Sequence, residues 1–271
     1  MSSLEFLYKT AVGRILLKPL TSRAVSRLSG AFLDTRLSKV FIKSFVRKNN
    51  IRLEDYVLDD IGSFNDFFCR RIKDGLRITD MDPGILASPC DGLLTVYRIA
   101  PDTVIPVKQS AYTIADLLED RDLAMEFNGG LCMVFRLCVD HYHRYSYVES
   151  GTKSANKHIR GVYHTVRPVA LEEYPVFVRN SREYCVIDTP DRGRLVQMEV
   201  GAMLVGRIVN DEPGVCGVIR GREKGHFEYG GSTIIVLTQK DMINIREDIY
   251  EASIEGIEIP VRMGEAVGRK I

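Results

Sequence analysis

The chain has 271 residues, 45% of them hydrophobic and 27% charged, which is typical of one large globular domain, with or without a helical extension. Its net charge of +1 gives no global reason to expect nucleic acid as a partner. No apolar stretch reaches the ~18 residues of a membrane-spanning helix, and the six cysteines show neither a CxxC pair nor the density of a disulfide framework, so we expect reduced thiols.

The first fifty residues carry most of the charge asymmetry. They hold two anions, Glu5 and Asp34, against ten cations, a local charge of +8 that leaves −7 for the remainder. A basic N-terminal segment followed by an acidic remainder predicts an anionic surface as the partner of the N-terminal segment. The cations are Lys9, Arg14, Lys18, Arg23, Arg27, Arg36, Lys39, Lys43, Arg47 and Lys48.

Apolar residues recur at helical spacing through this segment. They predict one helix from Leu4 that ends at Pro19, a second capped by Thr21, and its continuation from Leu37 to the break at Asn49–Asn50. Such basic amphipathic helices either pack on their own domain or lie in a membrane interface with their cations near anionic headgroups. We predict that residues 1–50 form a membrane-associating segment, peripheral on the cytoplasmic face, without a transmembrane helix.

After residue 50 the pattern becomes β-rich. A short helical stretch is expected around residues 63–72 and one helix around 112–127. Short apolar runs separated by glycine-containing turns predict strands at LLTVYRI, LCMVFRLCV, CVIDT, RLVQMEV, MLVGRIV and STIIVL. The sequence therefore predicts an α+β fold with a mostly antiparallel β core, lipoyl-like strand-and-turn elements, and residues 51–271 as one domain.

The segment FEYGGSTIIVL places two glycines and two hydroxyl residues directly before a β-branched run. By itself this is typical of a tight turn that enters a buried strand. A chemical interpretation is that the Ser232 hydroxyl attacks the carbonyl of Gly231 and the amide becomes an ester, after which β-elimination and hydrolysis leave a pyruvoyl group. Glycine suits this reaction because it tolerates a strained peptide and leaves the carbonyl accessible.

The serine would need a base, and the chain has only five histidines. His141 and His143 lie in DHYHRYSY, directly after an apolar run, where side chains at a strand end can reach a cleft; His164 lies in GVYHTVRP. Asp91 in SPCDG could orient an imidazole, although Asp-Gly is equally typical of a turn. We find no convincing set of metal ligands.

Five segments in this order resemble the phosphatidylserine decarboxylase family, over the stretch from Ser63 to Leu237. SFNDFFCRRIKDGLR is similar to the stretch before the SPxDG motif, which stands here as SPCDG. DHYHRY is similar to the DYHRxH motif and NSREY to an asparagine-arginine segment. EVGAMLVGRI is similar to VGAxxVGxI, and FEYGGST to the cleavage motif LGST. The five motifs together favour this family far more than any one of them.

The resemblance implies a self-processing enzyme whose covalent cofactor, a pyruvoyl group, derives from Ser232. Cleavage between Gly231 and Ser232 would give a β subunit of residues 1–231 and an α subunit of residues 232–271. It also assigns Asp91 to the charge relay of self-cleavage and His143 to decarboxylation. No metal is implied.

One departure from the family pattern bears on the base. The second histidine of DYHRxH falls on Ser146, and the position of the motif's aspartate is His141. Since serine cannot replace an imidazole as a base near neutral pH, another residue must act. We prefer His164 as the substitute; His143 in both roles and His141 are the alternatives.

The resemblance further implies that phosphatidylserine forms a Schiff base with the pyruvoyl group and leaves as phosphatidylethanolamine after loss of CO₂. Expected partners are phosphatidylserine in an anionic membrane and the chain's own α and β subunits after cleavage. A second copy of the chain, in a homodimer, is a further expected partner. Two alternatives stay open: a pyruvoyl enzyme acting on a soluble amino acid, and a non-processing, lipoyl-like binding module.

Overall fold

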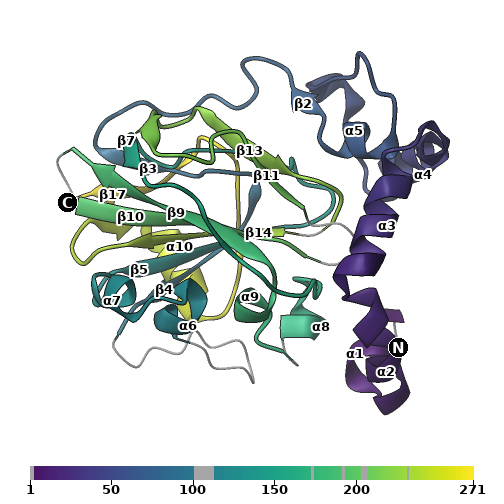
Figure 1. The fold of residues 1–271 in the computed structure, drawn as a ribbon. Helices are drawn as coiled ribbons and strands as arrows, with labels where there is room; N and C mark the ends of the chain where they lie inside the picture. The colour runs from purple at the N-terminus through teal and green to yellow at the C-terminus, as the bar shows by residue number, and fades with distance from the viewer. Residues whose placement is uncertain (1–2, 101–112, 172–173, 191–192, 203–206, 231) are drawn as a thin grey trace.

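The structure, a computed structural model, describes residues 3–100, 113–171, 174–190, 193–202, 207–230 and 232–271. Helices gather at the N-terminus and beside a β body, with α6, α8 and α9 on one side of its central sheet and α10 on the other (Figure 1). The helices are α1 (Ser3–Lys9), α2 (Ala11–Leu20), α3 (Arg23–Leu33), η1 (Arg36–Lys39), α4 (Val40–Lys48), η2 (Leu53–Asp55), α5 (Phe64–Phe68), α6 (Ile114–Leu118), α7 (Arg121–Met125), α8 (Pro168–Leu171), α9 (Val176–Arg179) and α10 (Glu247–Ile254).

The strands account for every apolar run expected from the sequence, with part of MLVGRIV outside the described residues. They are β1 (Tyr56–Val57), β2 (Arg71–Ile72), β3 (Ile85–Ala87), β4 (Gly92–Arg98), β5 (Leu131–Leu137), β6 (Arg144–Ser146), β7 (Gly151–Lys153), β8 (Lys157–Ile159), β9 (Arg182–Thr189), β10 (Gly193–Val200), β11 (Ile208–Asn210), β12 (Cys216–Val218), β13 (Glu223–Phe227), β14 (Ser232–Thr238), β15 (Ile243–Ile245), β16 (Ile259–Val261) and β17 (Ala266–Lys270).

The body is built on a nine-stranded sheet with the order β12-β7-β9-β10-β14-β5-β4-β16, in which β8 also pairs with β9. Two further sheets, β11-β13-β6 and β15-β17-β3, have three strands each. All strand pairs in these three sheets are antiparallel among the described residues. The expected α+β class with an antiparallel core is confirmed.

Strand β14 lies in the middle of this sheet and is buried on both faces. Ile235 and Leu237 point into one core cluster, which includes residues of α6, α8 and α9. Ile234 and Val236 point into a second cluster that includes residues of β6, β13 and α10. A strand covered on both sides needs apolar residues at every position, which explains the continuous run TIIVL.

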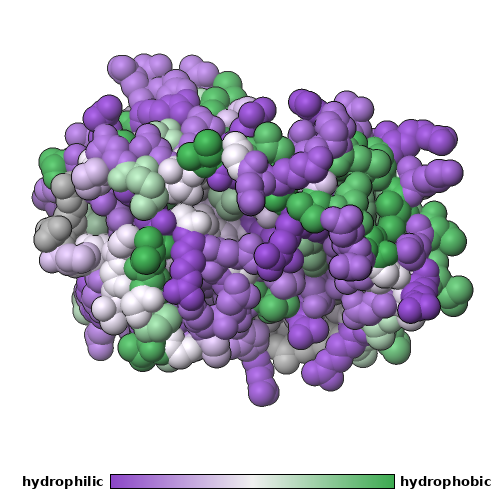
Figure 2. Space-filling view, turned by 90° about the horizontal axis from the view of Figure 1, so that it is seen from above, coloured by the Kyte–Doolittle hydropathy of each residue, from purple (hydrophilic) through white to green (hydrophobic). Residues whose placement is uncertain are grey.

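The N-terminal helices form a layer along one side of the body (Figure 1). Part of their apolar stripe packs inward, since Tyr8 and Leu17 are buried in the first core cluster. Other large apolar side chains of the layer are exposed, and Figure 2 shows them as green patches among protruding polar groups. None of the helices in the described parts of the chain is long and apolar enough to cross a membrane.

Helix boundaries differ from expectation in four places. The single helix expected from Leu4 to Pro19 is two, α1 and α2, separated at Thr10, whose side chain caps α2. Pro19 does not end the first helix but sits in the last turn of α2; Thr21 is its C-cap, and Ser22 caps α3 instead. The single helix expected around 112–127 is two short ones, broken at Glu119, whose φ is 47°. The stretch expected to be helical over 63–72 keeps only α5, since its end pairs as β2 with β1.

Candidate active site

Ser232 is the first residue of β14 and is fully buried. Its Oγ has no hydrogen-bond partner among the described residues, which is rare for a buried hydroxyl. Gly231, the other half of the expected cleavage site, lies outside the described residues. Gly230 has a φ of 144°, which favours glycine, so the chain turns sharply just before the strand. Ser232 is thus held at a turn with its nucleophilic oxygen unengaged.

The DHYHRY motif lies beside this serine because of strand pairing. Ser232 pairs with Leu137, the last residue of β5, and the motif begins three residues later. The backbone N–H of Phe227, in β13, donates to the carbonyl of His143 at 2.9 Å. His143 is therefore hydrogen-bonded to β13, the strand that leads into the cleavage segment. In the sequence, His143 follows β5, the strand that pairs with Ser232.

The protonation state of His143 follows from its contacts. Burial lowers the pKa of His143 to about 3, so the imidazole is neutral at ordinary pH. Its Nδ1 lies 2.9 Å from the carbonyl oxygen of His141, which can only accept, so Nδ1 carries the proton. Nε2 is buried without a partner among the described residues. The lone pair needed by a general base is therefore free on this nitrogen.

Aromatic side chains enclose His143 on the side of the cleavage segment. The ring of Phe68 lies 4.1 Å from that of His143, centroid to centroid, and 5.0 Å from that of Tyr229. Phe45 of α4 contacts both Phe68 and Tyr229. This wall keeps water from the imidazole and packs the N-terminal helices against the cleavage segment. No sequence pattern predicts a role for Phe68 or Tyr229, although both stand in segments that resemble the family.

Asp91 has an arginine rather than a histidine as its bonded partner. Arg77 donates Nε to Oδ1 at 2.7 Å and Nη2 to Oδ2 at 2.6 Å, and the backbone N–H of Met263 donates to Oδ1 at 2.9 Å. Asp91 precedes β4, which pairs with β5. It is thus two strands from Ser232, about 10 Å at the usual strand spacing. Arg77 belongs to the quoted family-like stretch, but no role was foreseen for it.

His141 and Ser146 occupy the two positions where the chain departs from the motif. The backbone N–H of Cys138 donates to His141 Nδ1, so a neutral His141 carries its proton on Nε2 and cannot accept there. Burial lowers the pKa of His141, and the charges of Asp140 and Asp91 oppose that shift. Ser146 Oγ lies 3.3 Å from the carbonyl of Pro89, in the SPCDG segment.

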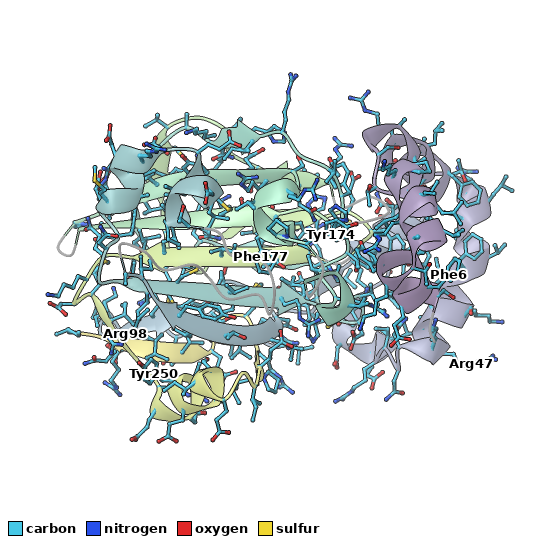
Figure 3. All side chains as sticks on the ribbon, turned by 90° about the horizontal axis from the view of Figure 1, so that it is seen from below. Phe6, Arg47, Arg98, Tyr174, Phe177 and Tyr250 are labelled. Atoms are coloured by element: carbon cyan, nitrogen blue, oxygen red, sulfur yellow. The ribbon has the colours of Figure 1, made fainter. Side chains whose placement is uncertain are left out.

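His164 lies under the first helix. Its ring stacks on Tyr174 at 4.6 Å, and its Nδ1 is 3.3 Å from the Tyr8 hydroxyl. That hydroxyl also accepts from the N–H of Thr165, so Tyr8 joins Nδ1 of His164 to the backbone of the next residue. Burial lowers the pKa of His164 to about 4. Figure 3 shows Tyr174 where the helical layer meets the body.

The NSREY segment connects His164 to the sheet. Asn180 donates both to the carbonyl of His164 and to that of Gly201, each at 2.8 Å. Gly201 follows Val200, which pairs with Thr233 of β14. Arg182 is buried and donates to backbone carbonyls of α6 and of the segment before β9. These two residues hold the backbone around the site rather than supply its chemistry.

The site combines an unengaged buried serine at a glycine turn with a neutral His143 whose Nε2 has no partner among the described residues; Nδ1 of His226, in β13, is also buried without one. No group of three or more metal-ligating side chains occurs among the residues that the structure describes. A buried serine and a neutral imidazole are the groups from which a class of enzymes builds a nucleophile and its base.

Comparison with known proteins identifies the family. The family described as "Phosphatidylserine decarboxylase" matches residues 64–269. Clostridium acetobutylicum "Phosphatidylserine decarboxylase proenzyme 2" is 41% identical over 98% of this chain and 91% of its own length. Proenzymes of Clostridium perfringens SM101 and Ruminiclostridium cellulolyticum are each 38% identical, over 97% and 99% of this chain and 91% of their own lengths. The chain belongs to the phosphatidylserine decarboxylase family and is a carboxy-lyase, which confirms the resemblance.

Proposed function

We propose that this chain cleaves itself between Gly231 and Ser232 and then converts phosphatidylserine to phosphatidylethanolamine and CO₂. The observation that carries the proposal is that Ser232 Oγ and His143 Nε2 are both buried without a hydrogen-bond partner among the described residues, on segments that strand pairing and the Phe227–His143 backbone bond bring together. The word "proenzyme" in the relatives' names supports processing, and their names support the substrate.

The residues at the start of β14 fit a pyruvoyl group formed from Ser232. Cleavage leaves this group at the N-terminus of the α subunit, still paired with β5 and β10 in the middle of the sheet. A pyruvoyl ketone supplies an electrophile for the substrate amine and takes up the electron pair left by CO₂. The protein surroundings exclude water and hold the serine and the imidazole in place.

His143 is the base best supported for self-cleavage. Of the three candidates, it alone has a buried ring nitrogen without a partner among the described residues; Nδ1 of His141 accepts from the N–H of Cys138, and Nδ1 of His164 is bonded to the Tyr8 hydroxyl. Once His143 has taken the serine proton, the same nitrogen can return a proton to carbon in decarboxylation. Asp91 contributes through its ion pair with Arg77, which fixes the SPCDG segment.

The N-terminal segment supports a membrane as the place of the reaction. Its cations favour anionic headgroups, and the exposed apolar side chains of α2, α3, η1 and α4 can enter the interface. Docking by this layer would bring the lipid to the side of the body on which α4 contacts the cleavage segment. We propose peripheral attachment at the cytoplasmic face.

The substrate is tested with processed protein and three compounds: vesicles containing phosphatidylserine, dispersed short-chain phosphatidylserine, and free serine. Release of CO₂ from both lipids and none from serine is expected. Release from serine at a rate equal to that from the lipids would favour an enzyme of soluble amino acids. Mass analysis of the same preparation shows whether the chain had been processed.

A further inference from the structure

A cleft of about 460 Å³ lies between α3 and the body. Ser26 and Arg27 of α3 and its C-cap Asp34 line one wall, and Ser181, Arg207 and Glu228 of the body line the other. Two arginines, two carboxylates and two serines on the walls of an open cleft suit a ligand that is polar.

Helix α3 separates this cleft from an apolar surface. The cleft residues lie on one face of the helix, while Leu28 and Phe32, both exposed, lie on the face turned away from Gly30 and Asp34. Further exposed apolar side chains follow on η1 and α4, at Leu37 and Val40. A polar cleft bordered by an exposed apolar surface fits an amphiphile with a charged head and apolar tails.

The charges in the cleft are of both signs. Arg27 has no ion-pair partner in the described part of the chain, whereas Arg207 is paired with Glu228 at 3.2 Å. Burial raises the pKa of Glu228, and the nearby Asp34 carboxylate adds to that rise although Arg207 opposes it. The cleft therefore presents an arginine without an ion-pair partner among the described residues, and one carboxylate on each wall, Asp34 and Glu228. A head that carries both an anionic and a cationic group matches this arrangement.

The cleft also lies within reach of the reacting residue. The N–H of Gly201 donates to the carbonyl of Ser181, and Thr233 pairs with Val200, so Ser181 is two strands from Ser232. Two strand spacings are about 10 Å. Glu228 is on the segment that runs from β13 to Ser232. A short headgroup bound at Arg27 can therefore extend its other end toward the start of β14.

We propose that this cleft is the headgroup subsite for the phospholipid substrate, with Arg27 binding the phosphodiester and the serine end of the head passing Glu228 toward Ser232. The acyl chains leave over Leu28 and Phe32 toward the membrane. This inference rests on the proposed function. It adds the residues that recognise the phosphate and orient the amine toward Ser232.

The test compares processed wild-type protein with Arg27→Gln on dispersed short-chain phosphatidylserine, which removes any contribution of membrane docking. A lost charge-assisted contact with phosphate predicts a rise in KM of about tenfold or more, with kcat changed less than about threefold. Arg27→Lys should recover part of the loss. Arg121→Gln, which removes an exposed arginine of α7, is the matched control and should leave KM unchanged.

A second variant fills the cleft without removing charge. Ala31→Trp, on the cleft wall, should raise KM at least as much as Arg27→Gln. Glycerophosphoserine should inhibit wild-type protein competitively and inhibit Arg27→Gln about tenfold less well. Equal KM values for Arg27→Gln and Arg121→Gln would overturn the inference, as would inorganic phosphate inhibiting as well as glycerophosphoserine. An unprocessed or inactive wild-type protein would instead overturn the proposed function.

Discussion

The start of β14 and the N-terminal helices depart from ordinary packing in opposite ways. Around Ser232, polar atoms are buried without partners. In the N-terminal helices, large apolar side chains are exposed: Phe6, Val12, Ile15, Leu16, Leu28, Phe32, Leu37, Val40 and Phe41. A buried unpartnered hydroxyl is costly and is kept where it reacts, while an exposed apolar patch is kept where it meets another surface. The comparison separates a region of chemistry from a region of attachment.

Buried polarity alone does not mark the reactive region. Lys224 and Glu199 are completely buried, but they pair at 2.7 Å and share Asn210. Thr238 Oγ1, at the far end of β14, also lacks a partner among the described residues. However, no described histidine is hydrogen-bonded to a residue next to Thr238. What distinguishes Ser232 is the combination of an unengaged oxygen, a glycine turn and a neutral imidazole with a free lone pair.

The largest effect is expected at the serine. Ser232→Ala removes the nucleophile and the precursor of the pyruvoyl group, so both self-cleavage and decarboxylation should be lost completely. Gel analysis and CO₂ release measure the two steps separately. Thr233→Ala, which removes the neighbouring buried hydroxyl, is the control and should still be processed. Processing of Ser232→Ala would disprove the assignment.

Replacement of the base should slow the chemistry without preventing folding. His143→Ala is expected to reduce the rate of self-cleavage by about 10²–10⁴, the usual contribution of a general base. His164→Ala and His141→Ala should process within about threefold of wild type, because their Nδ1 atoms are engaged. If His164→Ala proved the slow variant, the base would be the substitute first preferred from the sequence.

Loss of the partner of Asp91 should mainly affect stability. Arg77→Met leaves a largely buried carboxylate unpaired, which costs about 3–5 kcal/mol when a buried pair is broken. Chemical denaturation of the unprocessed Ser232→Ala protein, with and without Arg77→Met, measures this loss. Arg52→Met, which breaks an exposed pair with Glu54, should change stability little. Equal effects of the two substitutions would mean that Arg77 does not stabilise the site.

The attachment region is tested by one matched pair of residues. Val40 on α4 and Ile254 on α10 are equally exposed, at 73% and 72%. Val40→Asp should weaken binding to anionic vesicles about tenfold, whereas Ile254→Asp should not change it. Vesicle flotation measures both, and processing should be normal in each. Equal binding by the two variants would show that α4 does not enter the interface.

The smallest expected effect is on the pH dependence of self-cleavage. Since the pKa of His143 is about 3 in the folded chain, the base stays unprotonated between pH 8 and 5, and the rate should change less than about twofold. Unfolded histidine binds protons below about pH 6.5, so His143 costs the fold up to ~1.4 kcal/mol per pH unit as pH falls from 6.5 toward 3. Time courses after synthesis in a cell-free system measure the rate. An inflection near pH 6.5, the ordinary pKa of histidine, would contradict His143 as the base.

Sequence patterns predicted much of this molecule because its strands are strongly apolar. The run STIIVL predicted β14, which is confirmed, and the order of motifs predicted the family, which is confirmed too; the assignment of Ser232, Asp91 and His143 to its site stays a prediction. What could not be read from the sequence depends on contacts between distant segments. The ion pair of Asp91 with Arg77, and the hydroxyl of Tyr8 on His164, join residues 14 and 156 positions apart.

Local helix rules failed for a related reason. Pro19 was expected to end a helix, but proline removes a hydrogen bond only to the residue four positions earlier, and the last turn of α2 tolerates it. No local sequence pattern could predict the aromatic contact between Phe68 and Tyr229, since these residues come from segments more than 150 residues apart. Tertiary packing, not propensity, decides which side chains enclose the site.

The most direct test of the central claim is the mass spectrum of the denatured wild-type protein. Self-cleavage predicts two polypeptides, residues 1–231 and residues 232–271, with the smaller one beginning in a pyruvoyl group instead of serine. A borohydride-reduced sample should add two hydrogens to the smaller polypeptide alone. A single unbroken chain of 30.6 kDa would contradict the account.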